Sequence, residues 1–471
     1  MPRSTSQLRS DAARIWRAGV AAVAPQRLIR EHVRVDGESL RVGDELIDLR
    51  PIGQIAIVGA GKAAGAMAVA LEEVLGPWLL AEKNVSGWVN VPADCTVPSH
   101  NVILHAARPA GVNEPRPEGV EGTRRILELV ASLGPNDLCL CVISGGGSAL
   151  LPAPVPEISL DDKIELTRLL SAAGADIEQL NTVRRELSLV KGGGLAGACN
   201  AGRLISLIIS DVLGDPVDLI ASGPTVERES TPADALAVLR DLQLTDEPTI
   251  APVVRCLQRG RESFATGDFD HGQRLPVAKD SRPLSHGQLK KVTNLIIGNN
   301  AAAVDAAGIE AERLGYSHAM ISATHSEGPA EDVGHHLAEM ALRMRDGPGP
   351  DCLISGGEPT VSLIEASQRG KGGRNQQLAL AALTKLGDCQ GIVLLSAGTD
   401  GEDGPTDAAG AIVTEEVVRR AREQQLNPLD YLSRNDAYAF FEASGGLFIT
   451  GPTQTNVCDL RVVFVNQNAA T

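Results

Sequence analysis

Aromatic residues are scarce in this chain of 471 residues, making up 3% of the sequence, although hydrophobic residues as a whole make up 43%. The hydrophobic cores must therefore be built mainly from Ala, Val, Leu and Ile. Such side chains suit a mostly parallel sheet covered by helices. Because the chain is longer than a typical single domain, the sequence predicts an α/β fold with two domains.

Positive charge is also in deficit, with 43 Lys and Arg against 59 Asp and Glu and a formal net charge of −16. Nucleic acids and anionic membranes select basic surfaces, so neither is an expected partner. No apolar run reaches the roughly 18 residues that a membrane span needs. A small anion in a local positive pocket is still compatible with this balance.

Paired cysteine motifs are absent: the eight cysteines form no CxxC pair, and several lie in predicted core strands, among them Cys139, Cys141 and Cys352. This pattern predicts reduced, buried thiols in a cytoplasmic protein and no metal framework. The arginine-rich first thirty residues could mimic an organellar transit peptide. The segment 8–23 also fits an amphipathic surface helix that begins the first domain, and we favour the helix.

The glycine-rich stretch SGGGSALL follows the apolar run 138–143, which predicts a buried strand that ends in a turn. Glycines leave backbone N–H groups uncovered, so a phosphate or carboxylate can approach closely. Taken alone, the stretch fits a tight turn without a ligand better than a ligand site. The residues assigned here to an anion site are Ser144, Gly145, Gly146, Gly147 and Ser148.

Comparable turns follow four other predicted strands. They begin at Gly59, Asp211, Gly298 and Gly398, and the stretch CLISGGEPTV at 352–361 repeats the form of SGGGSALL in the second half of the chain. Open α/β sheets bind ligands where the carboxyl ends of their strands meet. The repetition therefore predicts strand ends gathered around one crevice.

Several cations lie beside these turns. Lys62 lies within the first glycine turn, while Arg184 and Lys191 come before Gly192-Gly193-Gly194, and Arg374 precedes a predicted helix in the basic run 368–377. A cation at a helix N-terminus favours phosphate binding. The alternatives are a solvated lysine for Lys62, a helix-dipole complement for Arg184, and a flexible basic loop around Arg374.

Carboxylates follow two of the strands. Asp211 comes directly after the apolar run 204–209, where it could bind a metal ion, act as a base or orient a substrate hydroxyl. Its alternative role is to cap a turn. Glu358 and Asp400 could hold Mg²⁺ together with substrate phosphates, although the loop 398–404 lacks the spacing of a calcium-binding EF-hand.

Seven motifs occur in order: GAGKAA, SGGGSALL, NTVRRELSLVKGGGLA, SDVLGDP, SGGEPTV, GKGGRNQQ and SAGTDGEDG. In this order they resemble the class II glycerate kinases, over nearly the whole chain. The resemblance implies a Rossmann-like glycerate kinase domain at 1–285 and a MOFRL domain at 286–471. It also implies ATP-dependent phosphorylation of D-glycerate, typically to 2-phosphoglycerate, with Mg²⁺ and an active site in the cleft between the domains.

Residue roles follow from this resemblance. The family's functional lysine and arginine fall on Lys62 and Arg374, which would flank the transferred phosphoryl group, while Asp211 would serve the substrate hydroxyl or the metal. Ser144 to Ser148, Arg184 and Lys191 would hold the glycerate carboxylate. The residues assigned to the nucleotide are Gly298, Asn299, Asn300, Gly356, Gly357, Gly398 and Thr399.

Two other functions stay open. GAGKAAGA superficially resembles a nicotinamide-binding turn, which would suit an NAD(P)H-dependent hydroxypyruvate reductase, but no acidic ribose ligand follows it. A non-catalytic sensor of sugar acids would need the crevice without Lys62 or Asp211. The sequence leaves open whether the product is 2- or 3-phosphoglycerate, and it allows a homo-oligomer without predicting one.

Overall fold

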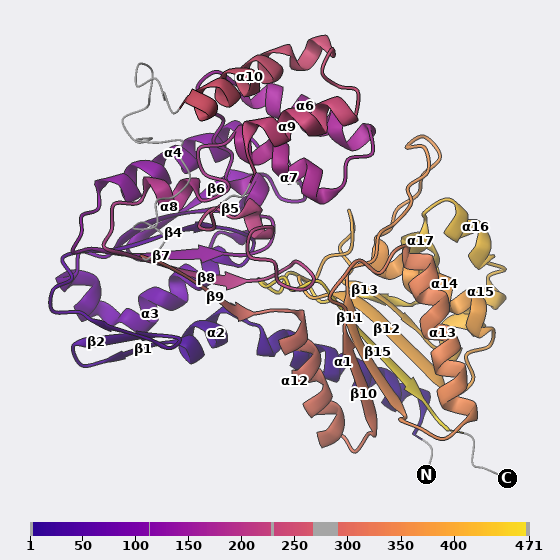
Figure 1. The fold of residues 1–471 in the computed structure, drawn as a ribbon. Coiled ribbons are helices and arrows are strands. Elements are labelled where there is room, and N and C mark those ends of the chain that lie inside the picture. Colours follow the sequence, from indigo (N-terminus) through magenta and orange to yellow (C-terminus); the bar gives the residue numbers. More distant parts are fainter. Residues whose placement is uncertain (1–2, 113, 228–229, 267–290, 468–471) are drawn as a thin grey trace. The chain divides into compact units, whose positions relative to one another are not determined.

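The computed structural model describes residues 3–112, 114–227, 230–266 and 291–467 (Figure 1). The chain forms two compact units, each with its own sheet. Unit 1 comprises Met1–Leu28, Ser210–Asp215 and Gly298–Thr471, and unit 2 comprises Ile29–Ile209 and Pro216–Ile297. The predicted two-domain α/β fold is confirmed.

Unit 2 contains a parallel sheet with the strand order β6-β5-β4-β7-β8-β9. Its strands are β4 (Ile55–Ala60), β5 (Ser86–Pro92), β6 (Val102–Arg108), β7 (Leu138–Ile143), β8 (Arg203–Ile209) and β9 (Val292–Gly298). In the register of β4 and β7, Ala60 pairs with Ile143. The glycine turns that follow these two strands therefore emerge side by side at one edge of the sheet.

Helices cover this sheet, among them α3 (Ala64–Glu82) and α4 (Pro117–Ser132); α8 (Gly194–Ala198) packs against α4, and α2 (Pro25–His32) comes before the sheet in the sequence. By length and composition alone, helix α3 could cross a membrane. The sequence analysis did not anticipate this, because acidic residues interrupt the apolar stretch of the helix. In the structure 61% of that stretch is buried, and the helix is kinked at Gly76, which precedes Pro77. These features are those of a core helix.

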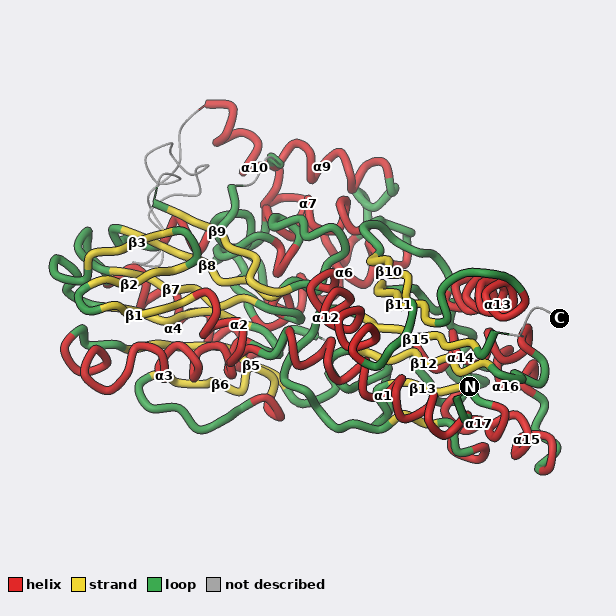
Figure 2. Tube along the Cα trace, turned by 90° about the horizontal axis from the view of Figure 1, so that it is seen from below, coloured by secondary structure: helices red, strands yellow, loops and turns green. Residues whose placement is uncertain are grey.

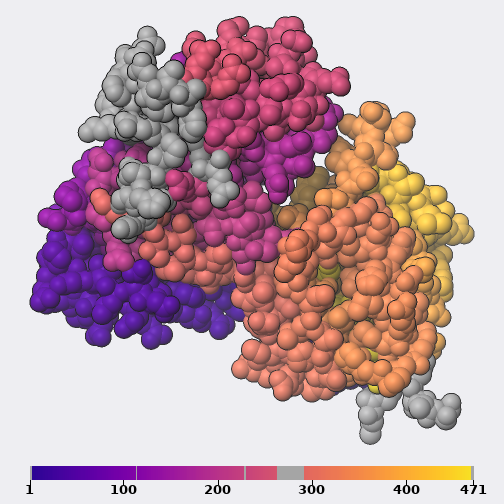
Figure 3. Space-filling view, viewed as in Figure 1, coloured from indigo at the N-terminus to yellow at the C-terminus, as the bar shows by residue number. Residues whose placement is uncertain are grey.

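A group of helices forms a separate lobe of unit 2, at the top of Figures 1 and 3. It contains α6 (Leu160–Ala172), α7 (Ile177–Glu186), α9 (Pro232–Asp241) and α10 (Ala251–Thr266), around a core of its own. Ser159 caps α6, because its side chain accepts from the N–H of Asp162 at 3.0 Å. An antiparallel sheet that the sequence did not predict, of β1 (Val33–Asp36), β2 (Ser39–Val42) and β3 (Glu45–Asp48), completes the unit.

Unit 1 contains a mixed sheet with the order β10-β11-β15-β12-β13-β14. Its strands are β10 (His318–Ser322), β11 (Cys352–Gly357), β12 (Ile392–Gly398), β13 (Gly410–Val413), β14 (Leu447–Phe448) and β15 (Asp459–Val465). The pairings make β10, β11, β12 and β14 run one way and β13 and β15 the other. The last strand thus lies at the centre, antiparallel to both of its neighbours.

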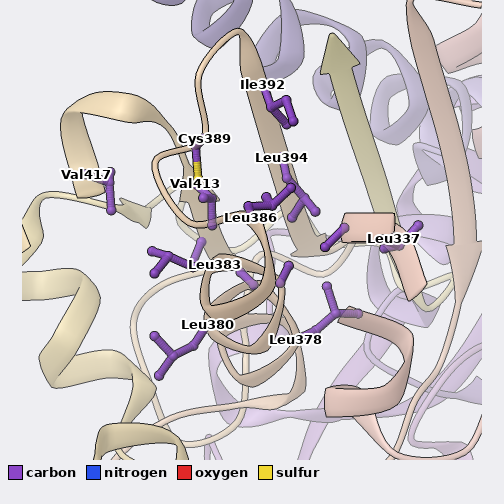
Figure 4. Packing of buried hydrophobic residues seen from close by; sticks show 14 of the residues in the cluster. Leu337, Leu378, Leu380, Leu383, Leu386, Cys389, Ile392, Leu394, Val413 and Val417 are labelled. Carbon is purple, nitrogen blue, oxygen red and sulfur yellow. The ribbon is translucent and has the colours of Figure 1, made fainter. Parts of the chain in front are cut away.

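Helices cover both faces of this sheet (Figure 2). One face packs against α13 (Ala330–Asp346), α14 (Arg374–Leu386), α15 (Glu415–Glu423), α16 (Pro428–Ser433) and α17 (Ala437–Ser444). Figure 4 shows Leu380 and Leu383 of α14 in this core with Leu394 and Val413 of the sheet. The core is largely aliphatic, as the composition predicts, with Phe440 and Phe441 of α17 as aromatic members.

The other face packs against α1 (Thr5–Ala22) and α12 (Asn300–Arg313). Trp16 of α1 is buried there and donates its Nε1–H to the carbonyl of Ala397 at 3.4 Å. The Tyr316 hydroxyl donates to Asp11 at 2.6 Å. The segment 8–23 is helical as predicted, and its apolar face is buried in the core of unit 1.

The units also divide the chain differently from the ranges 1–285 and 286–471. The boundary between 285 and 286 lies outside the described residues, and the structure changes from unit 2 to unit 1 at Ile297 and Gly298. In addition, Ser210–Asp215, which follows β8, belongs to unit 1. The predicted catalytic residue Asp211 therefore belongs to unit 1.

Candidate functional site

The two glycine turns of unit 2 are bound to each other. The N–H of Lys62 donates to the carbonyl of Gly145 at 2.9 Å, and the N–H of Ala63 donates to the Ser144 hydroxyl at 2.9 Å. Gly61 has a φ of +145°, and a Cβ there would lie 2.1 Å from the Ser144 hydroxyl oxygen. The close approach of the turns requires glycine and fixes the backbone from which Lys62 projects.

Two cations lie beside the second turn. A Cβ on Gly146, whose φ is +78°, would lie 3.2 Å from Nη2 of Arg108 and 3.9 Å from Cγ of Lys62. Glycine therefore lets both side chains approach the turn. The sequence analysis missed Arg108, although a cation at the end of a strand, here β6, could have drawn attention to it.

A cluster of three cationic side chains, called the cation cluster below, lies at the other end of the SGGGS turn; it consists of Lys163, Arg184 and Lys191. Nη2 of Arg184 donates to the Ser148 hydroxyl at 2.8 Å, and Nζ of Lys191 donates to the Ser148 carbonyl at 3.0 Å. Lys191 also bonds the Ser148 hydroxyl. The structure thus brings together Ser148, Arg184 and Lys191, as the sequence predicts.

No carboxylate of the described residues forms an ion pair with the cation cluster. Burial lowers the pKa of Lys163 to about 7, with the charge of Arg184 as a second cause, and lowers the pKa of Lys191 well below its ordinary value. The neighbouring Arg185 differs, because it pairs with Asp218 at 3.0 Å. An anionic ligand would supply the negative charge that the cluster lacks.

Two polar residues that the sequence analysis missed hold this arrangement. The Ser222 hydroxyl lies 3.0 Å from that of Ser148, donates to Oδ1 of Asn181 at 3.1 Å and accepts from Lys191 at 3.3 Å. Ala221 and Ser222 have φ values of +52° and +62°. Left-handed backbone at residues other than glycine is costly, and it is often found at ligand sites.

In unit 1, Arg374 begins helix α14 with its charge already neutralised. Its Nε and Nη2 donate to the two oxygens of Asp459 at 2.8 and 2.9 Å, and its Nη1 lies 3.0 Å from Glu358. Asp459 is fully buried. Carboxylates distant in sequence thus hold this side chain, and its role beside the transferred phosphoryl group stays a prediction.

The N-terminus of α14 is also occupied by a side chain of the protein. The N–H groups of Asn375 and Gln376 donate to the two oxygens of Asp403 at 3.0 and 2.8 Å. A carboxylate thus takes the position that the sequence analysis assigned to a phosphate. Burial raises the pKa of Asp403 to about 7, although the two N–H groups oppose this shift.

This shift predicts a pH-dependent stability. Folded Asp403 binds a proton up to about pH 7 and the unfolded residue only up to its ordinary value of 3.8, so the unfolding free energy should fall as pH rises between these values. Urea denaturation across this range should show a shallower decline for Asp403→Asn than for the unchanged chain. Parallel curves would contradict the raised pKa.

The polar residues assigned to the nucleotide have structural contacts in unit 1. Nδ2 of Asn300 donates to the carbonyls of Val457 and Asp459 at 2.8 and 2.9 Å, while Oδ1 of Asn299 accepts from Ala302 at 3.0 Å and caps α12. Thr399, which is buried, donates to the carbonyl of Cys458 at 2.6 Å. These side chains stabilise the ends of the strands and the start of α12 by hydrogen bonds. Their role in binding nucleotide stays a prediction.

The glycines of SGGE are explained by close packing. A Cβ on Gly356 would lie 1.8 Å from Oδ1 of Asn300, and a Cβ on Gly357 would lie 1.8 Å from Oε2 of Glu327. Glu327 in turn forms a bidentate pair with the buried Arg461, at 2.8 Å for each bond. Any larger residue would displace these side chains, and the role of both glycines in binding nucleotide stays a prediction.

Cys458 connects the carboxylate-bearing turns of unit 1. Its thiol donates to the carbonyl of Asp211 at 3.0 Å and contacts Glu358 at 3.8 Å. The structure thus brings Asp211, Glu358 and Arg374 together, whereas Lys62 belongs to unit 2. That Lys62 and Arg374 meet in one cleft stays a prediction.

These carboxylates suit Mg²⁺ only as partial ligands. No group of three or more His, Cys, Asp or Glu side chains among the described residues is arranged to hold a metal. Burial raises the pKa of Glu358, and the charges of Asp459 and Asp400 raise it further, against the opposing effect of Arg374. The excess of negative charge fits a divalent cation that keeps most of its ligands from water and phosphate.

Comparison with known families gives two matches. Residues 11–258 match the family described as "Domain of unknown function (DUF4147)", and residues 351–459 match the MOFRL family. The chain is 35% identical to "Glycerate kinase" of Danio rerio, with 98% of each chain covered, and 35% identical to "Glycerate kinase" of Homo sapiens, with 98% and 94% covered. A "Putative hydroxypyruvate reductase" of Agrobacterium vitis is 38% identical, with 88% of each chain covered.

Two solved structures share the fold. The crystal structure of a glycerate kinase from Thermotoga maritima has a TM-score of 0.77 and 34% identity, covering 98% of this chain and 100% of the other. A protein from Pyrococcus horikoshii has a TM-score of 0.75 and 31% identity, with 98% and 99% covered.

Proposed function

The chain belongs to the class II glycerate kinases, and from that membership we propose that it transfers the terminal phosphoryl group of ATP to D-glycerate and releases 2-phosphoglycerate. The observation that best supports the proposal is the cation cluster beside SGGGS, whose charges have no carboxylate partner among the described residues. An anionic ligand would balance these buried cations and keep the lysines protonated.

Arg184 and Lys191 would bind the glycerate carboxylate. Both converge on Ser148, at 2.8 Å for Arg184 and 3.0 Å for Lys191, so a carboxylate at this turn can accept from either side chain. The hydroxyl of Ser222 fixes the position of Ser148. Two oriented cations would restrict the rotation of a small substrate and so determine which hydroxyl is presented.

Lys62 would neutralise charge on the transferred phosphoryl group, since phosphoryl transfer depends on positioning and charge stabilisation more than on covalent catalysis. Nε and Nη2 of Arg374 are committed to Asp459, so the arginine would contribute through Nη1, which also lies 3.0 Å from Glu358. Asp211 would orient or deprotonate the acceptor hydroxyl. Mg²⁺, bound with the nucleotide, would be held by Glu358 and Asp400 and would supply further neutralisation of phosphate charge.

A hydroxypyruvate reductase is the second candidate, because relatives bear that name. The strand after the first glycine turn and helix is β5, which ends in Asn90-Val91-Pro92. A nicotinamide-binding unit places an acidic ligand for the ribose near this point. Asn90 is instead buried and donates to the carbonyl of Leu150 at 2.8 Å. This end of the strand therefore favours the kinase.

Phosphorus NMR on the purified chain with D-glycerate, ATP and Mg²⁺ tests the proposal. We expect a 2-phosphoglycerate signal that is absent without protein. A 3-phosphoglycerate signal would keep the kinase but reverse the proposed orientation of the substrate. Unchanged ATP would contradict the proposal, and NADH oxidation with hydroxypyruvate would then support the reductase, whereas glycerate binding without any turnover would support a sensor.

A further inference from the structure

When its lysines are protonated, the cation cluster holds more positive charge than one carboxylate neutralises, and an anion that binds there favours their protonated forms. We infer that it is a site for doubly charged anions, with inorganic phosphate and the phosphorylated product held more tightly than singly charged carboxylates. For inorganic phosphate the inference stands on charge and geometry alone, whereas for the product it also rests on the proposed function. The predicted consequence is inhibition by the product, in competition with glycerate.

The charge balance is the first argument. Lys163 and Lys191 are 8% and 3% exposed, and the charge of Arg184, which contacts Ser148, acts on both of them. A glycerate ion brings one negative charge, so part of the positive charge of the protonated cluster is not neutralised. A phosphate monoester brings about 1.5 to 2 negative charges at neutral pH, and it therefore balances the cluster more fully.

The arrangement of donors is the second argument. Arg184 has five N–H donors, and one nitrogen bonds Ser148 at 2.8 Å. None of its other nitrogen atoms is buried without a partner, so they reach solvent, where anion oxygens can accept from them. Lys191 adds a donor on the same hydroxyl. A phosphate has enough acceptor oxygens to use both side chains at once.

The hydroxyls beside the cluster are oriented for this purpose. Ser148 accepts from Arg184 and Lys191, so its own proton points toward Ser222, and Ser222 donates in turn to Asn181 at 3.1 Å. Both hydroxyl oxygens thus face the cations. The Ser148 oxygen stands where a ligand oxygen would bind, and the left-handed backbone at Ser222 holds its partner in place.

Proton uptake gives a signature of binding that is independent of turnover. The groups that face Lys191 are cationic, namely Arg184, Lys163 and Arg185, and with burial they lower its pKa. Burial also lowers the pKa of Lys163, to about 7. An anion opposes these effects, so its binding near pH 7 raises the proton affinity of both lysines. A dianion should therefore draw in more protons than a monoanion.

Titration calorimetry on the full chain without nucleotide tests the inference, with acetate and inorganic phosphate as probes near neutral pH. We expect phosphate to bind at least about tenfold more tightly than acetate, because its second charge is also neutralised. Repeating the titration in buffers with different ionisation heats should show greater proton uptake for phosphate. Equal affinity for the two anions would overturn the inference.

Substitutions in the cation cluster test whether it causes the preference for phosphate over acetate. Lys191→Met and Arg184→Gln each remove one positive charge, and each should reduce the preference for phosphate to about threefold or less. Lys385→Met makes a comparable change at an exposed lysine of α14 that pairs with Glu339, and should keep the full preference. If Lys191→Met does not fold, Arg184→Gln decides. A full preference in the folded variants would overturn the assignment.

Parallel titrations with glycerate and 2-phosphoglycerate separate this inference from the proposed function. Turnover of glycerate with a product that binds no more tightly than the substrate would overturn product inhibition and leave the kinase intact. A strong preference for phosphate without any turnover would sustain the dianion site and reject the kinase.

Discussion

Arg374→Ala is expected to lower the free energy of unfolding by about 3 kcal/mol, as well as kcat by roughly a hundredfold or more. The stability loss follows from Asp459, which is 0% exposed and receives both Nε and Nη2 of the arginine. Without Arg374 this carboxylate keeps a hydrogen bond from Asn375 at 2.9 Å but loses its ion-pair partner. Urea denaturation and steady-state kinetics measure the two effects.

A double-mutant cycle distinguishes the lost ion pair from general damage. Asp459→Asn removes the charge that Arg374→Ala leaves unpaired, so the double variant should be more stable than the sum of the single changes predicts. Arg419→Ala, which breaks an exposed pair with Glu423 on α15, is the control and should cost less than about 1 kcal/mol. Strict additivity at positions 374 and 459 would show that the pair is not coupled.

The kinetics of Arg374 variants distinguish the structural role of this arginine from its catalytic role. Arg374→Lys keeps the positive charge but cannot make the fork of two parallel bonds to Asp459. We expect it to recover part of kcat and little of the stability. If Arg374→Ala kept near-normal turnover in the folded state, the ion pair would be the whole role of the arginine, and its assignment to the phosphoryl group would be rejected.

Local sequence patterns predicted the parts of the site that short segments build. The runs 55–58 and 138–143 are fully buried strands, and their glycine turns pack against each other as the spacing suggests. Arg184 and Lys191 meet at Ser148 because a single helix and turn carry them beside the SGGGS turn. Residue type, strand periodicity and glycine chemistry suffice for inferences of this kind.

Contacts between distant segments were not predictable in this way. Asp459 lies 85 residues after Arg374 and begins the last strand, which the sheet order places at its centre. The basic run around Arg374 therefore resembled an exposed loop until its partners were known. The packing of α1 in the core of unit 1 and the capping of α14 by Asp403 were missed for the same reason. Sequence spacing carries no information on which distant segments come into contact.

Lys62→Ala is expected to reduce kcat by roughly a hundredfold or more while leaving the fold intact. The backbone of Lys62 is held by its bond to Gly145 at 2.9 Å, which the substitution retains. The side chain is only partly buried, so its removal opens no core cavity. The loss should fall on kcat, because Lys62 would stabilise the charge as it is redistributed over the phosphoryl and leaving oxygens in the transition state, and initial-rate kinetics measure it.

Two further variants show whether the charge of Lys62 or its bulk matters. Lys62→Arg keeps the charge and should restore part of the lost rate, whereas Lys62→Met keeps most of the length and should not. Lys385→Ala, at an exposed site on α14, should keep normal turnover. Equal rates for Lys62→Met and the unchanged chain would exclude a role for this charge in phosphoryl transfer, and the glycine turn would then serve only to pack β4 against β7.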